Sequence, residues 1–228
     1  MSYGEVCLIL ARGQSKGIPR KNLQTVGGVP LVVRAVRAAH ESVLSREVYV
    51  STDDAEIAEY AKEDGAHIID RPPLLSSDDS SSESAVLHGL SELGITDGKV
   101  IMIQPTSPFL RGEDLTALLR VANSHDSALT VTESHRFIWR SRSDGLLDGV
   151  NHDYRARLRR QDLGFNEFAE NGAAYAMDVS QFRLTRHRFF GRIGHVVMPI
   201  IRSIEIDELA DLEFANVIAE YLAFRNRE

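Results

Sequence analysis

Residues 8–22 read LILARGQSKGIPRKN, an apolar strand that runs directly into a loop with two glycines and several cationic side chains. Gly13 and Gly17 would allow backbone N–H groups to approach an anion closely. The positive charges of the loop come from Arg12, Lys16, Arg20 and Lys21. Because cationic groups and free N–H groups together favour phosphate oxygens, this stretch predicts a polyphosphate-binding loop at the end of a buried strand.

The spacing within this loop differs from the two most familiar phosphate-binding motifs. A Walker A loop needs Gly-x4-Gly-Lys-[Ser/Thr], and the dinucleotide fingerprint needs Gly-x-Gly-x-x-Gly. Here the glycines are spaced Gly13-x3-Gly17, and Lys16 comes before the second glycine. The sequence therefore indicates neither an ordinary NTPase nor a dehydrogenase.

The composition favours a single α/β domain over residues 1–228. The chain has a net charge of −7 and is 43% hydrophobic, which suffices for a substantial core. Since the chain is acidic overall, the basic loop is a local feature and no nucleic-acid partner is expected. The one cysteine, Cys7, lies in the first apolar run and predicts a buried thiol in a reducing, cytoplasmic compartment. No signal-like segment or long apolar run occurs, so no membrane partner is expected.

Apolar runs predict four strands, at residues 6–10, 47–51, 67–69 and 100–103. Their hydrophobicity is continuous rather than alternating, which is typical of strands covered on both faces. Helical patterns lie between several of them, at residues 31–40 after Pro30 and at residues 55–63 after a cap at Asp53. This order predicts a three-layer α/β/α fold with a mostly parallel, Rossmann-like sheet. Ligands of such sheets bind beyond the carboxyl ends of the strands, where the basic loop emerges.

Three other segments carry organisational signals. Residues 76–84 read SSDDSSSES and precede a helical pattern at residues 84–93, so their side chains can cap that helix and offer hydroxyl groups to a bound base. Residues 134–166 are polar, arginine-rich and less periodic, which favours an arm that leaves the sheet and packs on a second subunit. The last helix, at about residues 209–224, has an apolar face and is expected to close the fold.

The basic loop resembles the N-terminal loop of the acylneuraminate cytidylyltransferases, the family of CMP-sialic acid synthetases. That family has an apolar strand followed by Ala-Arg-x-x-Ser-Lys-Gly-x-x-x-Lys-Asn. Further similar segments follow in the family's order: QPTSP at 104–108, RRQD at 159–162, ENGAAY at 170–175 and SIEID at 203–207. The resemblance covers residues 8–219. It implies a nucleotide-diphospho-sugar transferase fold, a dimerisation arm at about residues 134–166 and a homodimer.

The resemblance also implies a reaction and a set of site residues. CTP would activate a nonulosonic, sialic-type acid of nine carbons to give a CMP-sugar and pyrophosphate. Catalysis is assigned to Arg12, Lys16, Lys21 and Asp207. Nucleotide binding is assigned to Leu10, Ala11, Arg12, Gly13, Lys16, Lys21, Asn22, Arg71, Ser80 and Ser82, with Asn22 at the ribose and Arg71, Ser80 and Ser82 at the cytosine. Binding of the sugar acid is assigned to Gln104, Arg160, Asn171, Tyr175, Phe189 and Phe190.

The residue chemistry supports part of this assignment. Gln104 follows a predicted strand and carries both a donor and an acceptor for a sugar hydroxyl. The planar guanidinium of Arg160 can donate two parallel hydrogen bonds to a carboxylate, although a solvated basic face is an equal reading of this arginine cluster. Adjacent phenylalanines such as Phe189 and Phe190 are more often core residues than ligand contacts.

Two carboxylates near the end of the chain are candidate metal ligands. Alternation in a strand at residues 203–207 would place Glu205 and Asp207 on one face, where they can hold Mg²⁺, with Mn²⁺ as an alternative. Taken alone, Asp207 could equally cap the last helix while Glu205 faces solvent. The family usually has Asp at both positions, so Glu205 is a departure. Ala169 is another, since many members have arginine two residues before the Asn-Gly pair.

These departures leave two alternatives open. One is a CMP transferase for a related acid, such as legionaminic, pseudaminic or Kdo acid, which a substrate panel would separate. The other is a non-catalytic homologue that binds the nucleotide or the sugar without turnover. Binding of CTP without release of pyrophosphate would indicate the second alternative.

Overall fold

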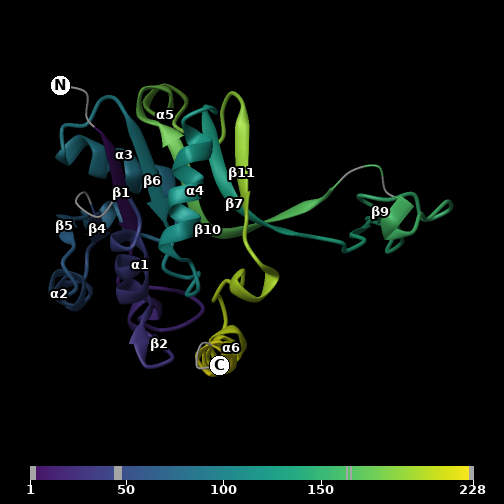
Figure 1. Cartoon of the computed structure of the whole chain (residues 1–228), viewed down its shortest axis with the longest axis horizontal. Helices are drawn as coiled ribbons and strands as arrows, with labels where there is room; N and C mark the ends of the chain where they lie inside the picture. Colours follow the sequence, from purple (N-terminus) through teal and green to yellow (C-terminus); the bar gives the residue numbers. More distant parts are fainter. Residues whose placement is uncertain (1–3, 44–47, 163, 165, 226–228) are drawn as a thin grey trace.

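The computed structural model describes residues 4–43, 48–162, 164 and 166–225. Within this part, seven strands form one sheet in the order β11-β7-β10-β6-β1-β4-β5 (Figure 1). Their bounds are β1 (Glu5–Leu10), β4 (Val48–Thr52), β5 (His67–Asp70), β6 (Lys99–Ile103), β7 (Ser127–Glu133), β10 (Phe168–Asp178) and β11 (Ile193–Val197). Strand β10 runs antiparallel to β6 and β7, and the other pairs are parallel. The prediction of a mostly parallel sheet is confirmed.

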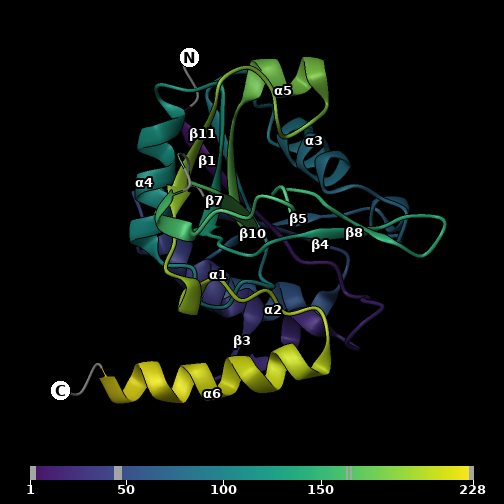
Figure 2. The ribbon, with the colours of Figure 1, turned by 90° about the vertical axis from the view of Figure 1, so that its right-hand side faces the viewer.

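Helices cover both faces of this sheet (Figures 1 and 2). One face carries α1 (Leu31–His40), α2 (Ala55–Glu63) and α4 (Gly112–Ala122), and the other carries α3 (Ser82–Glu92) and α5 (Val179–Thr185). Strand β1 serves both layers: Cys7 and Ile9 belong to the first core cluster, whereas Val6 and Leu8 pack with α3. Burial on both faces explains the continuous hydrophobicity of the strand, and the three-layer prediction is confirmed.

The local capping signals were identified with one error. Helix α1 has the predicted bounds. Helix α2 is capped by Asp54, not by Asp53: the Asp54 carboxylate accepts the N–H groups of Glu56 and Ile57, each at 3.0 Å. Asp53 instead accepts the N–H of Gly13 at 2.9 Å. Two adjacent aspartates offer the same capping chemistry, and what distinguishes them is that Asp53 accepts the N–H of Gly13.

An arm leaves the sheet between β7 and β10. It carries the hairpin of β8 (Trp139–Ser141) and β9 (Leu147–Gly149), which lies well away from the helices in Figure 1. His152 packs against the rings of Phe137 and Trp139, with ring centres 4.7 and 4.8 Å apart. Several apolar side chains of the arm are exposed: Ile138, Trp139, Leu146, Leu147, Val150, Tyr154 and Leu158. The excursion predicted at residues 134–166 corresponds to this arm, of which residues 163 and 165 lie outside the described residues.

Helix α6 (Leu209–Arg225) packs across the end of the molecule opposite α5 (Figure 2). Its buried residues Ala215, Ile218 and Ala219 join a third apolar cluster with Ile18 of the basic loop and Val26. Val26 lies in the hairpin of β2 (Thr25–Val26) and β3 (Val29–Pro30). The short 3-10 helices of the described chain are η1 (Lys21–Leu23), η2 (Pro73–Leu75), η3 (Arg160–Asp162) and η4 (Ile200–Arg202). None of the helices that the structure describes is long and apolar enough to cross a membrane.

The burial of Cys7 leads to a simple prediction. Cys7 is fully buried in β1, an interior strand of the sheet, and burial raises the pKa of its thiol well above the ordinary value. Because the thiolate is the reactive species, the native protein is expected to show no reaction with a thiol reagent such as DTNB. Labelling in urea should then give one thiol per chain. Rapid labelling of the folded protein would contradict this packing.

Candidate functional site

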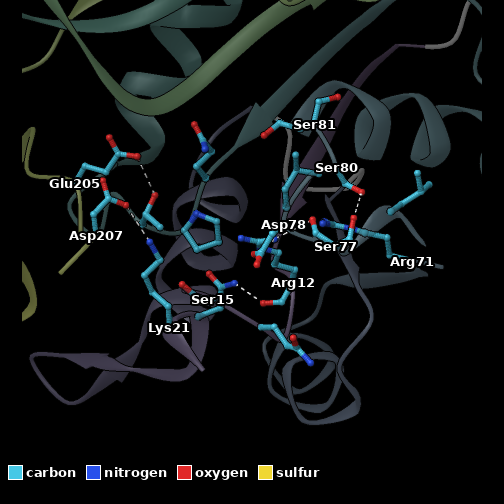
Figure 3. Close-up of a pocket in the computed structure, with 18 residues that line it drawn as sticks. Arg12, Ser15, Lys21, Arg71, Ser77, Asp78, Ser80, Ser81, Glu205 and Asp207 are labelled. Atoms are coloured by element: carbon cyan, nitrogen blue, oxygen red, sulfur yellow. Dashed lines mark hydrogen bonds and ion pairs between the residues drawn. The ribbon is translucent and has the colours of Figure 1, made fainter. Parts of the chain in front are cut away.

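A polar pocket of about 250 Å³ opens at the carboxyl ends of β1, β5 and β6 (Figure 3). This is the edge of the sheet where the sequence predicts a ligand. Ten of the predicted site residues line the pocket: Leu10, Arg12, Lys21, Asn22, Arg71, Ser80, Ser82, Gln104, Glu205 and Asp207. Ser77, Asp78 and Ser81 of the serine-rich segment predicted to meet the base also line it. The residues that were not predicted are Gln14, Ser15, Leu75, Pro105 and Thr106.

The first cationic side chain of the loop is held by the serine-rich segment. Arg12 Nη1 donates to the carbonyl oxygen of Ser77 at 3.0 Å and lies 3.1 Å from Asp78 Oδ1. Lys16 Nζ lies 3.4 Å from Asp78 Oδ2, but the Lys16 side chain is 75% exposed and is not among the described residues that line the pocket. The Asp78 carboxylate therefore forms ion pairs with both cations of the loop.

The glycines of the loop serve other purposes than the sequence analysis assigned. The N–H of Gly13 donates to Asp53 and is therefore already used within the protein. A Cβ at position 17 would collide with the backbone carbonyl oxygen of Asp207. Gly17 thus allows residues 203–207 to approach the loop, which brings two acidic residues beside it. Ala11, which was also assigned to the nucleotide, is fully buried in the core and does not line the pocket.

Lys21 connects the basic loop to these acidic residues (Figure 3). Its Nζ donates to the carbonyl oxygen of Ile206 at 2.9 Å and to Asp207 Oδ1 at 3.0 Å, and only 14% of its side chain is exposed. Glu205 lies next to Asp207 and accepts from Thr106 at 3.5 Å. Burial and the charge of Asp207 raise the pKa of Glu205, while Lys21 opposes the shift. The two carboxylates of Glu205 and Asp207 therefore carry more negative charge than the positive charge of Lys21 balances.

The strand predicted at residues 203–207 is absent, because these residues have no regular secondary structure. Ile206 is buried in the third apolar cluster and its N–H donates to the carbonyl oxygen of Thr106 at 2.8 Å. This anchor leaves the flanking Glu205 and Asp207 at the pocket. Asp207 also does not cap α6, since the Asp211 carboxylate accepts the N–H groups of residues 207 and 208.

The opposite end of the pocket is made by buried polar groups. Arg71 donates Nε to Ser51 Oγ at 3.0 Å and Nη2 to the carbonyl oxygen of Ser51 at 2.6 Å. Burial lowers the pKa of Arg71 to about 10, with the charge of Asp53 opposing the shift and that of Arg12 adding to it. Asn22 Nδ2 donates to the carbonyl oxygen of Arg12 at 2.8 Å and so fixes the start of the loop.

A family model described as Cytidylyltransferase matches residues 6–183 of this chain. The chain belongs to the cytidylyltransferase family. The match contains the basic loop, the serine-rich segment and Gln104, and it ends before the segment of Glu205 and Asp207.

Curated relatives of this cytidylyltransferase carry a more specific name. N-acylneuraminate cytidylyltransferase A of Danio rerio is 38% identical over 173 residues, which cover 74% of this chain and 40% of the relative. N-acylneuraminate cytidylyltransferase of Streptococcus agalactiae serotype V is 28% identical over 234 residues, which cover 98% of this chain and 55% of the relative. The chain thus spans about half the length of the curated relatives it matches.

Solved structures share the fold of this cytidylyltransferase. CMP:2-keto-3-deoxy-manno-octonic acid synthetase complexed with CTP superimposes with a TM-score of 0.71 at 17% identity, covering 96% of this chain and all of that one. The 4-diphosphocytidyl-2C-methyl-D-erythritol synthase of Anaerococcus prevotii gives a TM-score of 0.69 at 14% identity, covering 97% and 96%. These likenesses show that the fold is a nucleotidyltransferase fold.

Most residues assigned to the sugar acid lie outside this pocket of the cytidylyltransferase. Asn171 is buried, accepts from Thr130 Oγ1 at 2.7 Å and donates to Ser203 Oγ at 3.2 Å. With Ala169, it lines a second cavity of about 520 Å³ at the base of the arm. Tyr175 is also buried, and Phe189 packs edge-on against its ring at 6.0 Å.

Two further residues from the sequence analysis have no described place at the pocket. Phe190 is half-buried and packs with the α3 and α5 layer. Arg160 begins η3, and its side chain lies outside the described residues. In the described part of the chain no set of three or more acidic, histidine or cysteine side chains is arranged to hold a metal. Glu205 and Asp207 are therefore a pair of carboxylates, which is the number that Mg²⁺ commonly uses when substrate phosphates supply other ligands.

Proposed function

We propose that this cytidylyltransferase transfers CMP from CTP to the anomeric 2-hydroxyl of a nonulosonic, sialic-type acid and releases pyrophosphate. One observation supports this most: a single pocket at the carboxyl edge of the sheet is lined by the cations Arg12 and Lys21 and by the carboxylates of Glu205 and Asp207. Transfer of a nucleotidyl group requires cationic groups and a metal ion at the phosphates, and these two carboxylates are the candidate ligands of that ion. The names of the curated relatives support the nature of the acid.

In this proposal the triphosphate lies along the basic loop. Arg12 and Lys16 exchange the Asp78 carboxylate for phosphate oxygens, and Lys21 stabilises charge that develops as pyrophosphate leaves. Arg71, Ser80 and Ser82 lie at the end of the pocket assigned to cytosine, and Asn22 lies at the ribose. Backbone contacts from Leu10 complete this set. The protein contributes by positioning the hydroxyl in line with the α-phosphorus and by neutralising charge.

Glu205 and Asp207 are the residues that would hold Mg²⁺ or Mn²⁺. The donor set fits a hard cation, since both groups are carboxylates at the pocket and a cation would relieve their mutual repulsion. When bound, the ion would neutralise phosphate charge. Lys21 keeps the Asp207 carboxylate oriented by its hydrogen bond at 3.0 Å.

The sugar acid would lie beyond Gln104, whose amide can bind a hydroxyl group. Arg160 is proposed for the carboxylate of the acid, with Asn171, Tyr175, Phe189 and Phe190 around its acyl group. The family resemblance suggests that the phenylalanines act on the site of a partner subunit. A homodimer formed through the arm would also cover its exposed apolar side chains. Sedimentation showing monomers alone would contradict the dimer.

The direct test is release of pyrophosphate from CTP and Mg²⁺ with N-acetylneuraminic, legionaminic, pseudaminic and Kdo acids in parallel. The panel is repeated with ATP, GTP and UTP as controls for the base. Release with CTP and one nine-carbon acid supports the proposal and identifies the substrate, whereas release with Kdo alone supports the eight-carbon alternative. Binding of CTP without release for any acid would contradict a transferase and favour the non-catalytic alternative.

A substitution tests the proposed metal ligands. The variant Asp207→Asn keeps the size of the side chain but removes its charge, so the Mg²⁺ concentration for half-maximal release is expected to rise about 10- to 100-fold. Glu208→Gln is the matched control, because Glu208 is exposed and does not line the pocket. An unchanged Mg²⁺ dependence in Asp207→Asn would rule out this residue as a ligand.

A further inference from the structure

Arg188 connects two parts of the molecule that flank the pocket. Its Nε donates to Glu83 Oε1 at 2.7 Å, and its guanidinium carbon lies 4.6 Å from the centre of the Tyr175 ring. The side chains of Arg188 and Glu83 are only 17% and 15% exposed. Water screens this ion pair less than an exposed one, and the aromatic face of Tyr175 adds a cation–π contact. The positions of the three side chains are therefore held more firmly than those of an exposed ion pair.

Glu83 adjoins the serine residues of the pocket that the sequence assigned to cytosine. It lies in the first turn of α3, directly after Ser81 and Ser82, which both line the pocket. Ser81 caps this helix by accepting the N–H of Ser84 at 3.1 Å. A displacement of Glu83 would therefore move the two serines with it, since helix and cap form one short rigid unit.

Tyr175 is the contact of Arg188 on the sheet, and it is buried in the core beside the pocket rather than in its lining. It lies in β10, where it pairs with Met102 of β6. Two residues further along the chain, the N–H of Gln104 donates to the carbonyl oxygen of Ala173 at 3.1 Å. Met102 packs in the apolar cluster that contains α3, and Gln104 follows directly after the end of β6 and lines the pocket. Arg188 thus joins the serine edge of α3 to the strand pair that carries Gln104.

The electrostatics of the pair agree with this geometry. Partial burial alone would raise the pKa of Glu83, but the hydrogen bond and charge of Arg188 outweigh it and lower the pKa below its ordinary value. Burial likewise acts to lower the pKa of Arg188, and Glu83 reverses that shift. Each group is therefore held charged by the other. Removal of one leaves the other partly buried without its partner, which favours movement of α3 toward water.

We propose that Arg188 is a positioning residue for the nucleotide: through Glu83 and Tyr175 it fixes the separation between the serine edge of α3 and the Gln104 edge of the sheet. This inference rests on the proposed function in one respect, namely that CTP is the nucleotide that occupies the pocket. Arg188 is not among the described residues that line the pocket, so its effect on affinity passes through the positions of Ser81 and Ser82.

The experiment is a double-mutant cycle on the whole protein, with CTP binding measured by calorimetry in the presence of Mg²⁺ and without a sugar acid. Arg188→Met and Glu83→Gln are each expected to weaken CTP binding about tenfold, and the double variant should bind no more weakly than the weaker single variant. Arg188→Lys retains a donor for Glu83 and should recover part of the loss.

Arg183→Met provides the matched control. Arg183 also joins α5 to α3, with Nη1 donating to Ser91 Oγ at 3.5 Å, but it contacts the end of α3 that is remote from the pocket. CTP affinity should be unchanged in this variant. Melting temperatures are recorded for every variant, since a merely structural pair would lower the melting temperature and leave the affinity of the folded protein intact.

The outcomes separate this inference from the proposed function. Unchanged CTP affinity in Arg188→Met, or additive losses in the double variant, would overturn the positioning role while CTP binding by the wild type still stands. A coupled loss of CTP affinity in a protein that releases no pyrophosphate would support the positioning role and contradict the transferase. Absence of CTP binding by the wild type would overturn both.

Discussion

Replacement of Lys21 by methionine is expected to lower kcat/KM for pyrophosphate release by about 10²- to 10³-fold. Lys21 is the most enclosed cation of the basic loop, and its ammonium group lies within hydrogen-bond distance of Asp207. In this setting a positive charge is screened less by water than at the surface, so its effect on a developing negative charge is larger. Methionine keeps the length and apolar volume of the side chain, and a continuous pyrophosphate assay measures the loss.

Arg20→Met is the control for this substitution, because Arg20 is the neighbouring cation in the chain. Its guanidinium lies 2.9 Å from Asp54 and 2.8 Å from Glu56, which places it on α2 and outside the lining of the pocket. Loss of Arg20 should therefore change kcat/KM little. Equal losses in the two variants would show that overall charge, not the position of Lys21, matters for turnover.

Replacement of Arg202 by methionine is expected to destabilise the protein by about 3–5 kcal/mol. Arg202 and Asp114 form a bidentate pair in which the side chains are only 8% and 7% exposed. Arg202 Nη1 also donates to the carbonyl oxygen of Phe109 at 3.1 Å. Without the guanidinium, the Asp114 carboxylate stays buried and loses its cation. The backbone N–H of Arg111 still donates to it. The free energy of unfolding in urea, with the slope compared between variants, measures this effect.

A surface ion pair on the same helix gives the contrast. Arg111 Nη1 lies 3.4 Å from Glu113, and both side chains are exposed. Arg111→Met should cost less than about 1 kcal/mol, because water and salt screen exposed pairs. An equally small loss in the free energy of unfolding for both arginine variants would contradict this role. The buried pair would then not be what holds η4 and the segment before Glu205 against α4.

The elements predicted correctly from the sequence are those that depend on residues close together along the chain. The bounds of α1 followed from Pro30 and a helical pattern, and β1 followed from an uninterrupted apolar run, because local propensity and burial agree there. The position of the basic loop at the carboxyl edge followed from the alternation of strands and helices. The prediction of the cap of α2 was wrong because Asp53 and Asp54 are both good caps. The hydrogen bond that Asp53 accepts from Gly13 distinguishes them.

Contacts between distant segments explain what was missed at the site. Asp78 appeared to be part of a serine-rich cap, yet it pairs with Arg12, which lies 66 positions earlier in the chain. The segment of Glu205 and Asp207 is not a strand, and its two carboxylates reach the pocket because Ile206 is anchored in the core. No local pattern states which loops will meet, since those meetings depend on the packing of whole layers.

Hydrophobic period and residue chemistry within short windows were enough to predict the three-layer fold and the place of Gln104 at the carboxyl edge of the sheet, and they predict a phosphate-binding role for the first loop. Three contacts became known from the folded chain alone: the close approach of Gly17 to Asp207, the hydrogen bonds of Lys21 to residues 206 and 207, and the contacts of Arg188 with α3 and β10. These contacts span up to 190 positions of the chain, so they exist only once the core has brought the segments together.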